Sequence, residues 1–192
     1  MSKHKDNDSV SRLMCFALRH KPEAFGLRLD VQGWIGISEL ARSLDVPATA
    51  ILQIAAKDDK GRYGLRAHHT EIRCVQGHST HQVSLDFDVA EPPDVLYHGT
   101  RRHVLDAIFK EGITPQTRHL VHLSADDATA YNVANRRRGT WAILTIKAAD
   151  MHRTGEYVFY RSENGVWLTK HVPPQYLGLI RYDTASNWTS RN

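Results

Sequence analysis

Phe87-Asp-Val-Ala-Glu-Pro-Pro-Asp94 is the stretch that divides this sequence of 192 residues into two parts. Its two prolines disfavour a helix, and a strand-like apolar pattern begins again at Val95. The length suits two small domains that share a surface as well as one medium domain. We therefore predict an N-terminal lobe (1–88), a linker (89–94), a second lobe (95–182) and a polar tail (183–192).

Upstream of this boundary, the pattern indicates three helices followed by a β-hairpin. Apolar residues recur at helical spacing near the N-terminus, and Asp8 or Ser9 can cap this first helix before Pro22 makes its continuation unfavourable. The predicted elements are helices over 10–21, from Ser38 onwards and through 50–55, then strands over 62–66 and 71–75. This order is typical of a winged helix, so we predict a winged-helix lobe.

Downstream of the boundary, short strands predominate. The predicted strands are Val95–Tyr97, Leu120–Leu123, Trp141–Ile146, Tyr157–Tyr160, Val166–Leu168 and Leu179–Tyr182. Helices fit at Arg102–Lys110 and Asp126–Asn135, which are too few for a doubly wound parallel sheet. We therefore predict a mixed sandwich of strands and helices, and an α+β fold class for the whole chain.

Composition and charge exclude several classes of protein. The chain has 41% hydrophobic and 24% charged residues, which is ordinary globular composition. Two cysteines cannot form a disulfide framework or a four-thiolate zinc site. No apolar run is long enough to span a bilayer, and the first ten residues lack a hydrophobic signal region. The net charge of +4 is too small for strong non-specific duplex binding. We expect a soluble, cytoplasmic monomer with no membrane partner.

Two cationic runs lie at predicted helix ends. Arg19-His20-Lys21 ends the first helix, where cations complement the helix dipole by roughly 0.3–1 kcal/mol each. The same residues could form an anion site, because a guanidinium grips two phosphate oxygens and an imidazole adds a proton that can be transferred. Local sequence favours the electrostatic interpretation. Arg136-Arg137-Arg138 likewise fits a solvated helix end better than a peripheral RNA contact.

The predicted hairpin carries a second set of polar residues whose role stays open. Arg62 follows the predicted turn Asp58-Asp59-Lys60-Gly61, and Gln76-Gly-His-Ser79 follows the second strand. These could be ordinary turn residues that cap backbone groups. Alternatively, Gly77 lets a ligand approach the backbone closely, while the neighbouring histidine and serine supply donors.

The second lobe contains a candidate ligand pocket at strand ends. His98-Gly-Thr100 ends a strand just before a predicted helix, so Gly99 would permit close approach of a ligand and the helix start would favour an anion. Val121-His122-Leu-Ser124 adds a second histidine and a hydroxyl group. Neither a Rossmann glycine pattern nor a P-loop is present, so a nucleotide would be held by another architecture.

Metal binding has little support in the sequence. The tempting pairs are His68-His69, His78 with His81, and His119 with His122. Adjacent histidines on a strand point to opposite faces, and the other pairs lack a third ligand. We therefore expect no metal site.

Taken together, these motifs resemble those of the tRNA 2′-phosphotransferases known as Tpt1 or KptA. The matching stretches, in the family's order, are LRHKPEAFGLRLDVQGW (18–34), DDKGRYGLR (58–66), IRCVQGHST (72–80), LYHGT (96–100), RHLVHLSADDATA (118–130) and ENGVWLT (163–169). Each is weak alone, but the ordered set is highly specific and extends to about Leu179. Cys74 departs from the resemblance, because the family usually has alanine there.

The resemblance implies a fold, a cofactor and a set of site residues. It implies a winged-helix lobe and an ADP-ribosyltransferase-like lobe with the active site in the cleft between them. The family's catalytic set falls on Arg19, His20, Arg62 and Arg118. Its ADP-ribosyltransferase signature falls on His98, His122 and Val166, and the NAD pocket would also include Gly99, Thr100 and Ser124.

The implied reaction removes an internal RNA 2′-phosphate, as left at a tRNA splice junction, with NAD⁺ as acceptor and without a metal. The phosphate attacks the nicotinamide ribose to give an RNA-2′-phospho-ADP-ribose intermediate. The products are 2′-OH RNA, nicotinamide and ADP-ribose 1″,2″-cyclic phosphate. His20, whose ordinary pKa is about 6.5, could protonate the leaving 2′-oxygen. A phosphate monoester is already an anionic nucleophile, so apolar Val166 is consistent with this acceptor.

Two alternatives belong to other classes of function. One is ADP-ribosylation of a nucleic-acid terminal phosphate or of a protein, which would give a stable ADP-ribosylated product. The other is a non-catalytic winged-helix protein that binds nucleic acid, which would need a basic recognition helix. Residues 48–58 contain only Lys57 as a basic side chain, so the second alternative is weak.

Overall fold

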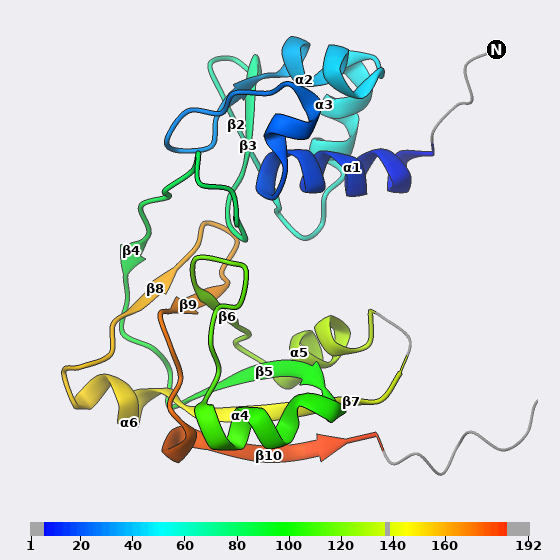
Figure 1. Ribbon diagram of the computed structural model, residues 1–192. Helices are drawn as coiled ribbons and strands as arrows, with labels where there is room; N and C mark the ends of the chain where they lie inside the picture. Colours follow the sequence, from blue (N-terminus) through cyan, green and yellow to red (C-terminus); the bar gives the residue numbers. More distant parts are fainter. Residues whose placement is uncertain (1–5, 137–138, 184–192) are drawn as a thin grey trace, which may run out of the picture. The chain divides into compact units, whose positions relative to one another are not determined.

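The computed structural model describes residues 6–136 and 139–183, and it shows an α+β protein whose sheets are antiparallel (Figure 1). The chain forms two compact units, one ending at Phe87 and the other beginning at Asp88. Each unit has its own hydrophobic core.

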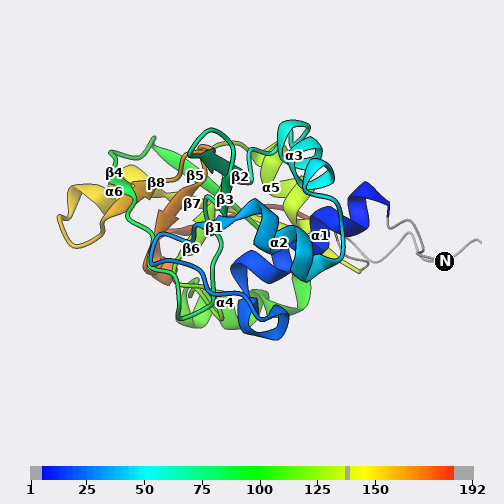
Figure 2. The ribbon, with the colours of Figure 1, turned by 90° about the horizontal axis from the view of Figure 1, so that it is seen from above.

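The first unit contains three helices and one small sheet. The helices are α1 (Asn7–Arg19), α2 (Ile37–Leu44) and α3 (Ala48–Ala56), and the strands are β1 (Ile35–Gly36), β2 (Tyr63–Arg66) and β3 (Glu71–Cys74). The strands pair antiparallel in the order β1-β3-β2. Figure 2 shows the three helices together on one side of these strands. The helices and the hairpin expected from the sequence are therefore present.

The boundaries of α1 follow from its sequence. Its cap is Asp6, whose carboxylate accepts a hydrogen bond of 2.8 Å from the backbone N–H of Ser9. The prediction of Asp8 or Ser9 as the cap was wrong, because the helix begins at Asn7, before the first buried residue. The helix ends at Arg19, and the short 3₁₀ helix η1 (Pro22–Phe25) follows.

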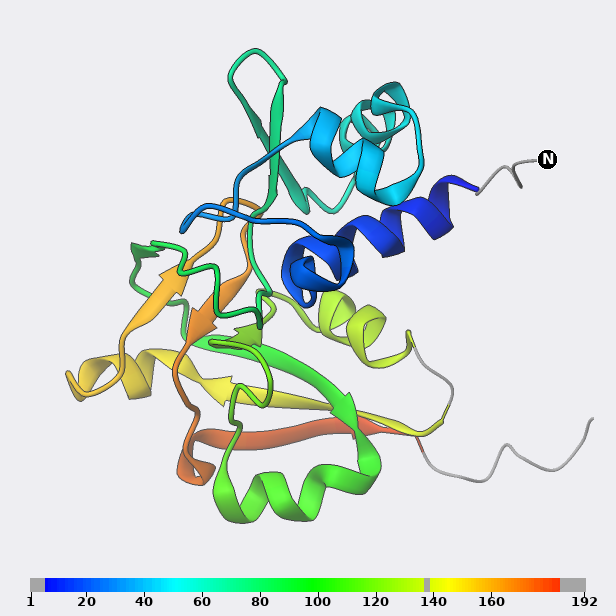
Figure 3. The ribbon, with the colours of Figure 1, turned by 45° about the horizontal axis from the view of Figure 1, so that its top comes forward.

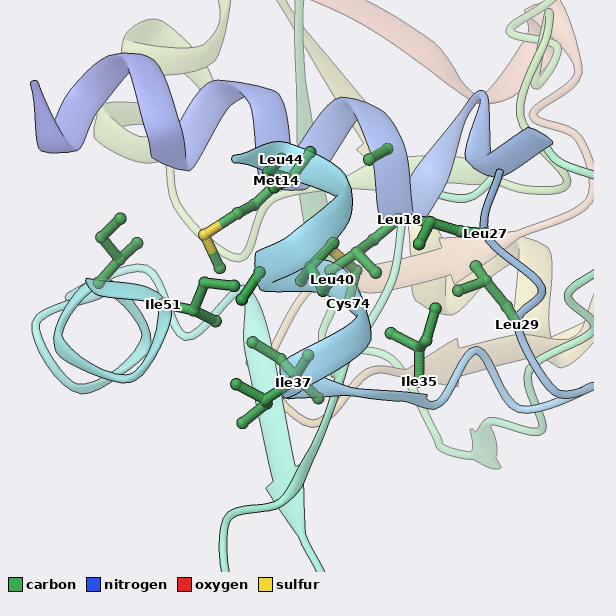
Figure 4. Packing of buried hydrophobic residues seen from close by; sticks show 14 of the residues in the cluster. Met14, Leu18, Leu27, Leu29, Ile35, Ile37, Leu40, Leu44, Ile51 and Cys74 are labelled. Carbon is green, nitrogen blue, oxygen red and sulfur yellow. The ribbon is translucent and has the colours of Figure 1, made fainter. Parts of the chain in front are cut away.

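The core of the first unit lies between the helices and β3. Figure 4 shows Met14 and Leu18 from α1 packed with Leu40 from α2 and with Cys74 from β3. These four side chains are completely buried. Burial of a large aliphatic side chain contributes roughly 2 kcal/mol to stability, so this packing fixes the end of α1 against β3.

The second unit contains two antiparallel sheets with short helices. The strands are β4 (Asp88–Val89), β5 (Val95–Arg101), β6 (Val121–Leu123), β7 (Trp141–Lys147), β8 (Phe159–Arg161), β9 (Trp167–Thr169) and β10 (Leu177–Tyr182), and the α-helices are α4 (Leu105–Glu111), α5 (Asp127–Ala134) and α6 (Ala148–Arg153). One sheet has the order β10-β7-β5 and the other β4-β8-β9-β6. Two further 3₁₀ helices are η2 (Arg102–Val104) and η3 (Pro174–Tyr176).

Within the described residues, the two sheets of the second unit are joined at an isolated bridge. The backbone N–H of Tyr97 in β5 donates to the carbonyl of Ser124 at 2.9 Å, and the backbone N–H of Ser124 donates to the carbonyl of Tyr97 at 2.8 Å. Figure 3 shows α5 running along the sheet that contains β5. This bridge fixes the middle of β5 beside the end of β6, which positions the histidines described below.

Several details differ from the sequence-based expectation. Helix α6 was not predicted, because six residues are too few to show a helical period. Strand β4 pairs Asp88 with Arg161 and Val89 with Tyr160, so the chain joins the sheet of the second unit before it reaches Pro92. Strand β8 was predicted two residues too early, at Tyr157.

Candidate functional site

The C-terminal end of α1 is tied to the loop that follows β3. The carbonyl of Arg19 accepts hydrogen bonds from the backbone N–H groups of Ser79 at 2.8 Å and Thr80 at 3.2 Å. A carbonyl at a helix end lacks an intrahelical partner, so the loop supplies one. The loop therefore holds the last residue of α1 in a fixed position.

The guanidinium of Arg19 lies beside the backbone of Gly77. A Cβ at Gly77, where φ is +88°, would lie 3.5 Å from Nε, Cζ and Nη1 of Arg19. Among the described residues, the buried Nε and Nη2 atoms of Arg19 have no hydrogen-bond partner. Buried donors are usually satisfied, and a guanidinium binds phosphate through two parallel bonds. This group is therefore a candidate anion site.

His20 is oriented by a serine from the same loop. Its Nδ1 lies 2.9 Å from Oγ of Ser79, and its ring packs against Phe16 with centroids 6.1 Å apart. The serine and the phenylalanine together fix the plane of the imidazole. Of the loop residues singled out in the sequence, Gly77 lies at Arg19, Ser79 at His20, and His78 is buried beside Gly33.

Arg62 is held by an aspartate that sequence reasoning assigned only to a turn. Asp58 accepts from Nε of Arg62 at 2.8 Å and also from its backbone N–H. The side chain of Asp58 is 2% exposed and that of Arg62 is 29% exposed. Burial alone would raise the pKa of Asp58, but the hydrogen bonds and charge of Arg62 outweigh it and lower that pKa. The spacing of four residues between Asp58 and Arg62 is the sequence signal that could have predicted this pair.

In the second unit, two histidines are fixed through their Nδ1 atoms. Nδ1 of His98 lies 3.1 Å from the carbonyl of His122, and Nδ1 of His122 lies 2.9 Å from the carbonyl of Leu120. A carbonyl only accepts, so each Nδ1 carries a proton, and Nε2 is an acceptor where the ring is neutral. Burial lowers the pKa of His98, the bond to the His122 carbonyl raises it, and the charge of Arg118 lowers it; the net shift is downward. His98 is therefore neutral at pH 7.

The structure brings Arg118, Ser124 and Val166 to the same part of the second unit. Arg118 is close enough for its charge to act on His98. The β6–β9 register pairs Leu123 with Trp167, so Val166 lies across from Ser124 at the ends of both strands. Val166 is held in its turn by Ser162, whose Oγ accepts from the backbone N–H of Val166 at 3.0 Å. Sequence reasoning did not single out Ser162.

Gly99 has a different close neighbour from the one expected, whereas Thr100 lies near a strand end as predicted. A Cβ at Gly99 would overlap the backbone carbonyl of Ala130 in α5, so the close neighbour of this glycine is a helix. Thr100 is a strand residue of β5, opposite Ala142, and a 3₁₀ helix begins two residues later. The helix expected after this strand therefore begins at Arg102, and binding of an anion beside Thr100 stays a prediction. The parts of Gly99 and Thr100 in binding NAD stay predictions.

His68 and His69 lie in the turn between β2 and β3 with φ of +54° and +64°, so the alternation of side chains along a strand does not apply to them. No group of three or more His, Cys, Asp or Glu residues in the described chain could hold a metal ion. Arg137, Arg138 and all of the tail beyond Asp183 lie outside the described residues. In residues 6–136 and 139–183, every helix is too short or too polar to span a bilayer.

Comparison with known proteins defines the class. The chain belongs to the RNA 2′-phosphotransferase, Tpt1/KptA family, which matches residues 5–171. It is therefore assigned to the transferases that act on a 2′-phosphate of RNA.

Bacterial relatives are similar over nearly their whole length. A "Probable RNA 2′-phosphotransferase" of Pseudomonas aeruginosa (strain UCBPP-PA14) is 44% identical over 181 residues, which cover 90% of this chain and 97% of that protein. One of Escherichia coli O6:K15:H31 (strain 536 / UPEC) is 44% identical over 184 residues, covering 92% and 99%. One of Pectobacterium carotovorum subsp. carotovorum (strain PC1) is 41% identical over 181 residues, covering 92% and 95%.

Proposed function

We propose that the protein removes an internal 2′-phosphate from RNA, of the kind left at a tRNA splice junction, by transferring it to NAD⁺. The observation that carries the proposal is the guanidinium of Arg19, whose buried Nε and Nη2 atoms lack protein partners. His20, oriented by Ser79, lies next to it in the chain. A cation with unmet donors beside an imidazole suits a phosphate that must be held while its oxygen leaves.

The three arginines provide fixed positive charge for the phosphate. Arg19 projects from the end of α1 and Arg62 from the start of the hairpin, held there by Asp58. Arg118 lies in the turn before β6, where its backbone N–H donates to the carbonyl of Pro115 at 3.1 Å. Negative charge develops on phosphate oxygens during transfer, and guanidinium groups stabilise it without changing protonation state. This accounts for a reaction without a metal.

His20 is proposed as the general acid. The 2′-oxygen of the RNA leaves as an alkoxide unless it is protonated, and an imidazole can supply that proton. The contact between Nδ1 and Ser79 directs the opposite ring nitrogen, Nε2, away from the loop. Ser79 is therefore proposed as the group that sets the direction of proton transfer.

The residues in the middle of β5 and at the end of β6 fit NAD⁺. When bound, NAD⁺ supplies an electrophilic ribose carbon and, after nicotinamide leaves, a ribose hydroxyl that accepts the phosphate. His98 and His122, with protonated Nδ1 atoms, offer Nε2 acceptors for ribose hydroxyl groups. Ser124 and Val166 lie across from each other beside them. We propose an ADP-ribosyltransferase-like fold for this unit and a winged-helix fold for the first.

Val166 favours transfer of phosphate over modification of a protein. A neutral acceptor such as a hydroxyl group needs a base to remove its proton, whereas a phosphate monoester is already ionised at pH 7. An apolar, half-buried residue at this position supplies no base. Helix α3 also argues against a non-catalytic binding role, because its sequence ATAILQIAA contains no basic residue to read a groove.

The test is incubation with NAD⁺ and a short RNA that carries one internal 2′-phosphate. The expected products are 2′-OH RNA, nicotinamide and ADP-ribose 1″,2″-cyclic phosphate, identified by chromatography and mass spectrometry. A stable ADP-ribosylated RNA as the end product would favour the alternative ADP-ribosyltransferase activity. Unchanged RNA in the presence of NAD⁺ would exclude the proposed reaction.

A further inference from the structure

The two cysteines of the chain meet beside the candidate anion site. Cys15 lies on α1, and its Sγ is 3.1 Å from the hydroxyl of Tyr63 in β2. Cys74 is the direct cross-strand neighbour of Tyr63 in the β2–β3 ladder. Cys15 packs against the core cluster that contains Cys74, and Cys74 is close enough to lower the pKa of the Cys15 thiol. The sequence separates these cysteines by 59 positions, so only the fold brings them together.

The two thiols have opposite environments. Cys15 is partly exposed, whereas Cys74 is completely buried. The hydrogen bond from Cys74, the charges of Arg19 and Arg62, and the Tyr63 hydroxyl together lower the pKa of Cys15 to about 6, although burial opposes this. Burial raises the pKa of the Cys74 thiol. The pair therefore consists of a partly exposed thiolate and a buried, protonated thiol. In thiol–disulfide exchange, the first can attack a disulfide and the second can resolve the mixed disulfide that forms.

We propose that Cys15 and Cys74 form a reversible disulfide through exchange with a low-molecular-weight disulfide such as oxidised glutathione, and that this bond switches off the anion site at Arg19. The disulfide itself is independent of the proposed function, but its effect on catalysis rests on that function. Neither cysteine has a part in the reaction proposed above.

The chemistry of the exchange balances in two steps. The Cys15 thiolate attacks one sulfur of the small disulfide, whose sulfur–sulfur bond breaks and releases one small thiolate. Cys74 then loses its proton to that thiolate and attacks Sγ of Cys15, which expels the second small thiolate. Two protein thiols are thereby oxidised to one disulfide, and one small disulfide is reduced to two thiols.

The position of the pair explains why oxidation would affect Arg19. Cys15 lies one helical turn before Arg19 on α1, and Cys74 lies three residues before Gly77, whose backbone packs on the guanidinium. Ser79, in the same loop, holds both the Arg19 carbonyl and the His20 ring. A covalent bond between α1 and β3 constrains both the end of α1 that carries Arg19 and the loop after β3 that contains Gly77 and Ser79. It also removes the thiolate charge that acts on Arg19.

The first experiment follows the thiols and does not depend on activity. The reduced full-length protein is incubated with oxidised glutathione, its remaining thiols are alkylated under denaturing conditions, and its mass is measured. We expect wild type to lose both alkylation sites without retaining glutathione. Cys74→Ala, which introduces the residue usual in the family, should stop at a glutathione adduct on Cys15, and Cys15→Ser should not react. An adduct on wild type that never resolves, or equal reaction of Cys15→Ser, would overturn the disulfide.

The second experiment follows the site. Oxidised wild type is expected to bind inorganic phosphate more weakly by calorimetry, and to remove 2′-phosphate about tenfold more slowly, with both recovered after reduction by dithiothreitol. Cys15→Ser should respond to neither treatment. If the disulfide forms and phosphate binding does not change, the switch is wrong. If phosphate binding changes and the protein has no phosphotransferase activity, the proposed function fails and the switch of the anion site stands.

Discussion

The three arginines that we propose act on the phosphate have three different environments, and this decides what each substitution can test. Arg19 is partly buried with unmet donors, Arg62 is paired with Asp58, and Arg118 is exposed. Removing Arg62 would leave the carboxylate of Asp58, which is 2% exposed, without its cation. Such a change mixes loss of stability with loss of catalysis. Arg118 is therefore the residue at which catalysis can be tested cleanly.

Arg118→Ala is expected to reduce 2′-phosphate removal at least ~100-fold, because one of the charges that stabilise the transition state is lost. Its melting temperature should stay that of wild type, since truncation of an exposed side chain rarely changes stability. His119→Ala, at the exposed neighbouring position, is the matched control and should keep full activity. Rates of 2′-OH RNA formation and thermal denaturation check both expectations. Near-normal activity of Arg118→Ala would remove this arginine from the mechanism.

Ser79→Ala tests whether orientation of His20 matters. The substitution removes the 2.9 Å contact between Oγ and Nδ1 but keeps the backbone bond from residue 79 to the Arg19 carbonyl. We expect the rate constant to fall about tenfold with little change in apparent RNA affinity, because proton transfer depends on geometry. Single-turnover kinetics measure this rate constant. Accumulation of the RNA-2′-phospho-ADP-ribose intermediate would be the sign of a slow second step. Ser84→Ala, an exposed serine elsewhere in the first unit, is the control. A selective loss of affinity would contradict the role given to Ser79.

Helices and strands whose apolar residues recur with a clear period could be predicted from the sequence. Elements that depend on contacts with distant parts of the chain could not. Helix α1 buries Val10, Met14 and Leu18 along one face, so its sequence shows a clear helical period. Helix α6 has six residues and shows none. Strand positions were identified by their apolar residues, but the pairing of β4 with β8 joins residues more than 70 positions apart. No local pattern encodes such a pairing.

The same distinction applies to the candidate site. The order of short motifs indicated Arg19, His20, His98 and His122 as candidates, because each motif is local. The contacts that orient these residues come from other parts of the chain. Asp58 was read as a turn residue, and the meeting of Cys15 with Cys74 depends on how α1 packs on β3. Residue types in motifs could be predicted from sequence, whereas their supports required the fold.

Packing of α5 on β5 gives a prediction for an element. Gly99→Ala would place a methyl group on the backbone carbonyl of Ala130, and a backbone cannot turn aside as a side chain can. We expect a loss of about 3 kcal/mol in the free energy of unfolding, because the helix must move away from the strand. Gly36→Ala is the matched control, since its nearest neighbour would be Cβ of Glu39 at 4.0 Å and its φ is −63°. Urea denaturation checks this, and equal stability of the two variants would contradict the packing.

At the scale of the whole molecule, each unit carries a titrating group that changes the free energy of unfolding, and the two groups act at different pH. In the first unit, the pKa of Asp58 is held below its ordinary value of 3.8. Its carboxylate therefore stabilises the folded state above pH 3.8, and this stabilisation is lost as the pH falls below that value. In the second unit, burial holds the pKa of His98 below its ordinary value of 6.5. The unfolded chain therefore binds more protons at this position than the folded chain as the pH falls below 6.5.

The second unit is thus expected to weaken on mild acidification before the Asp58 pair of the first unit does. Because the unfolded state gains the extra proton, the free energy of unfolding should decrease between about pH 7.5 and about pH 5.5. His98→Gln, which cannot titrate, should show a smaller decrease, whereas Asp58→Asn should show the same decrease as wild type in this range. Urea denaturation followed by tryptophan fluorescence measures all three proteins at both pH values. If His98→Gln and wild type lose stability equally, the proton uptake belongs to other groups, and the neutral state assigned to His98 in the folded protein does not govern its response to acid.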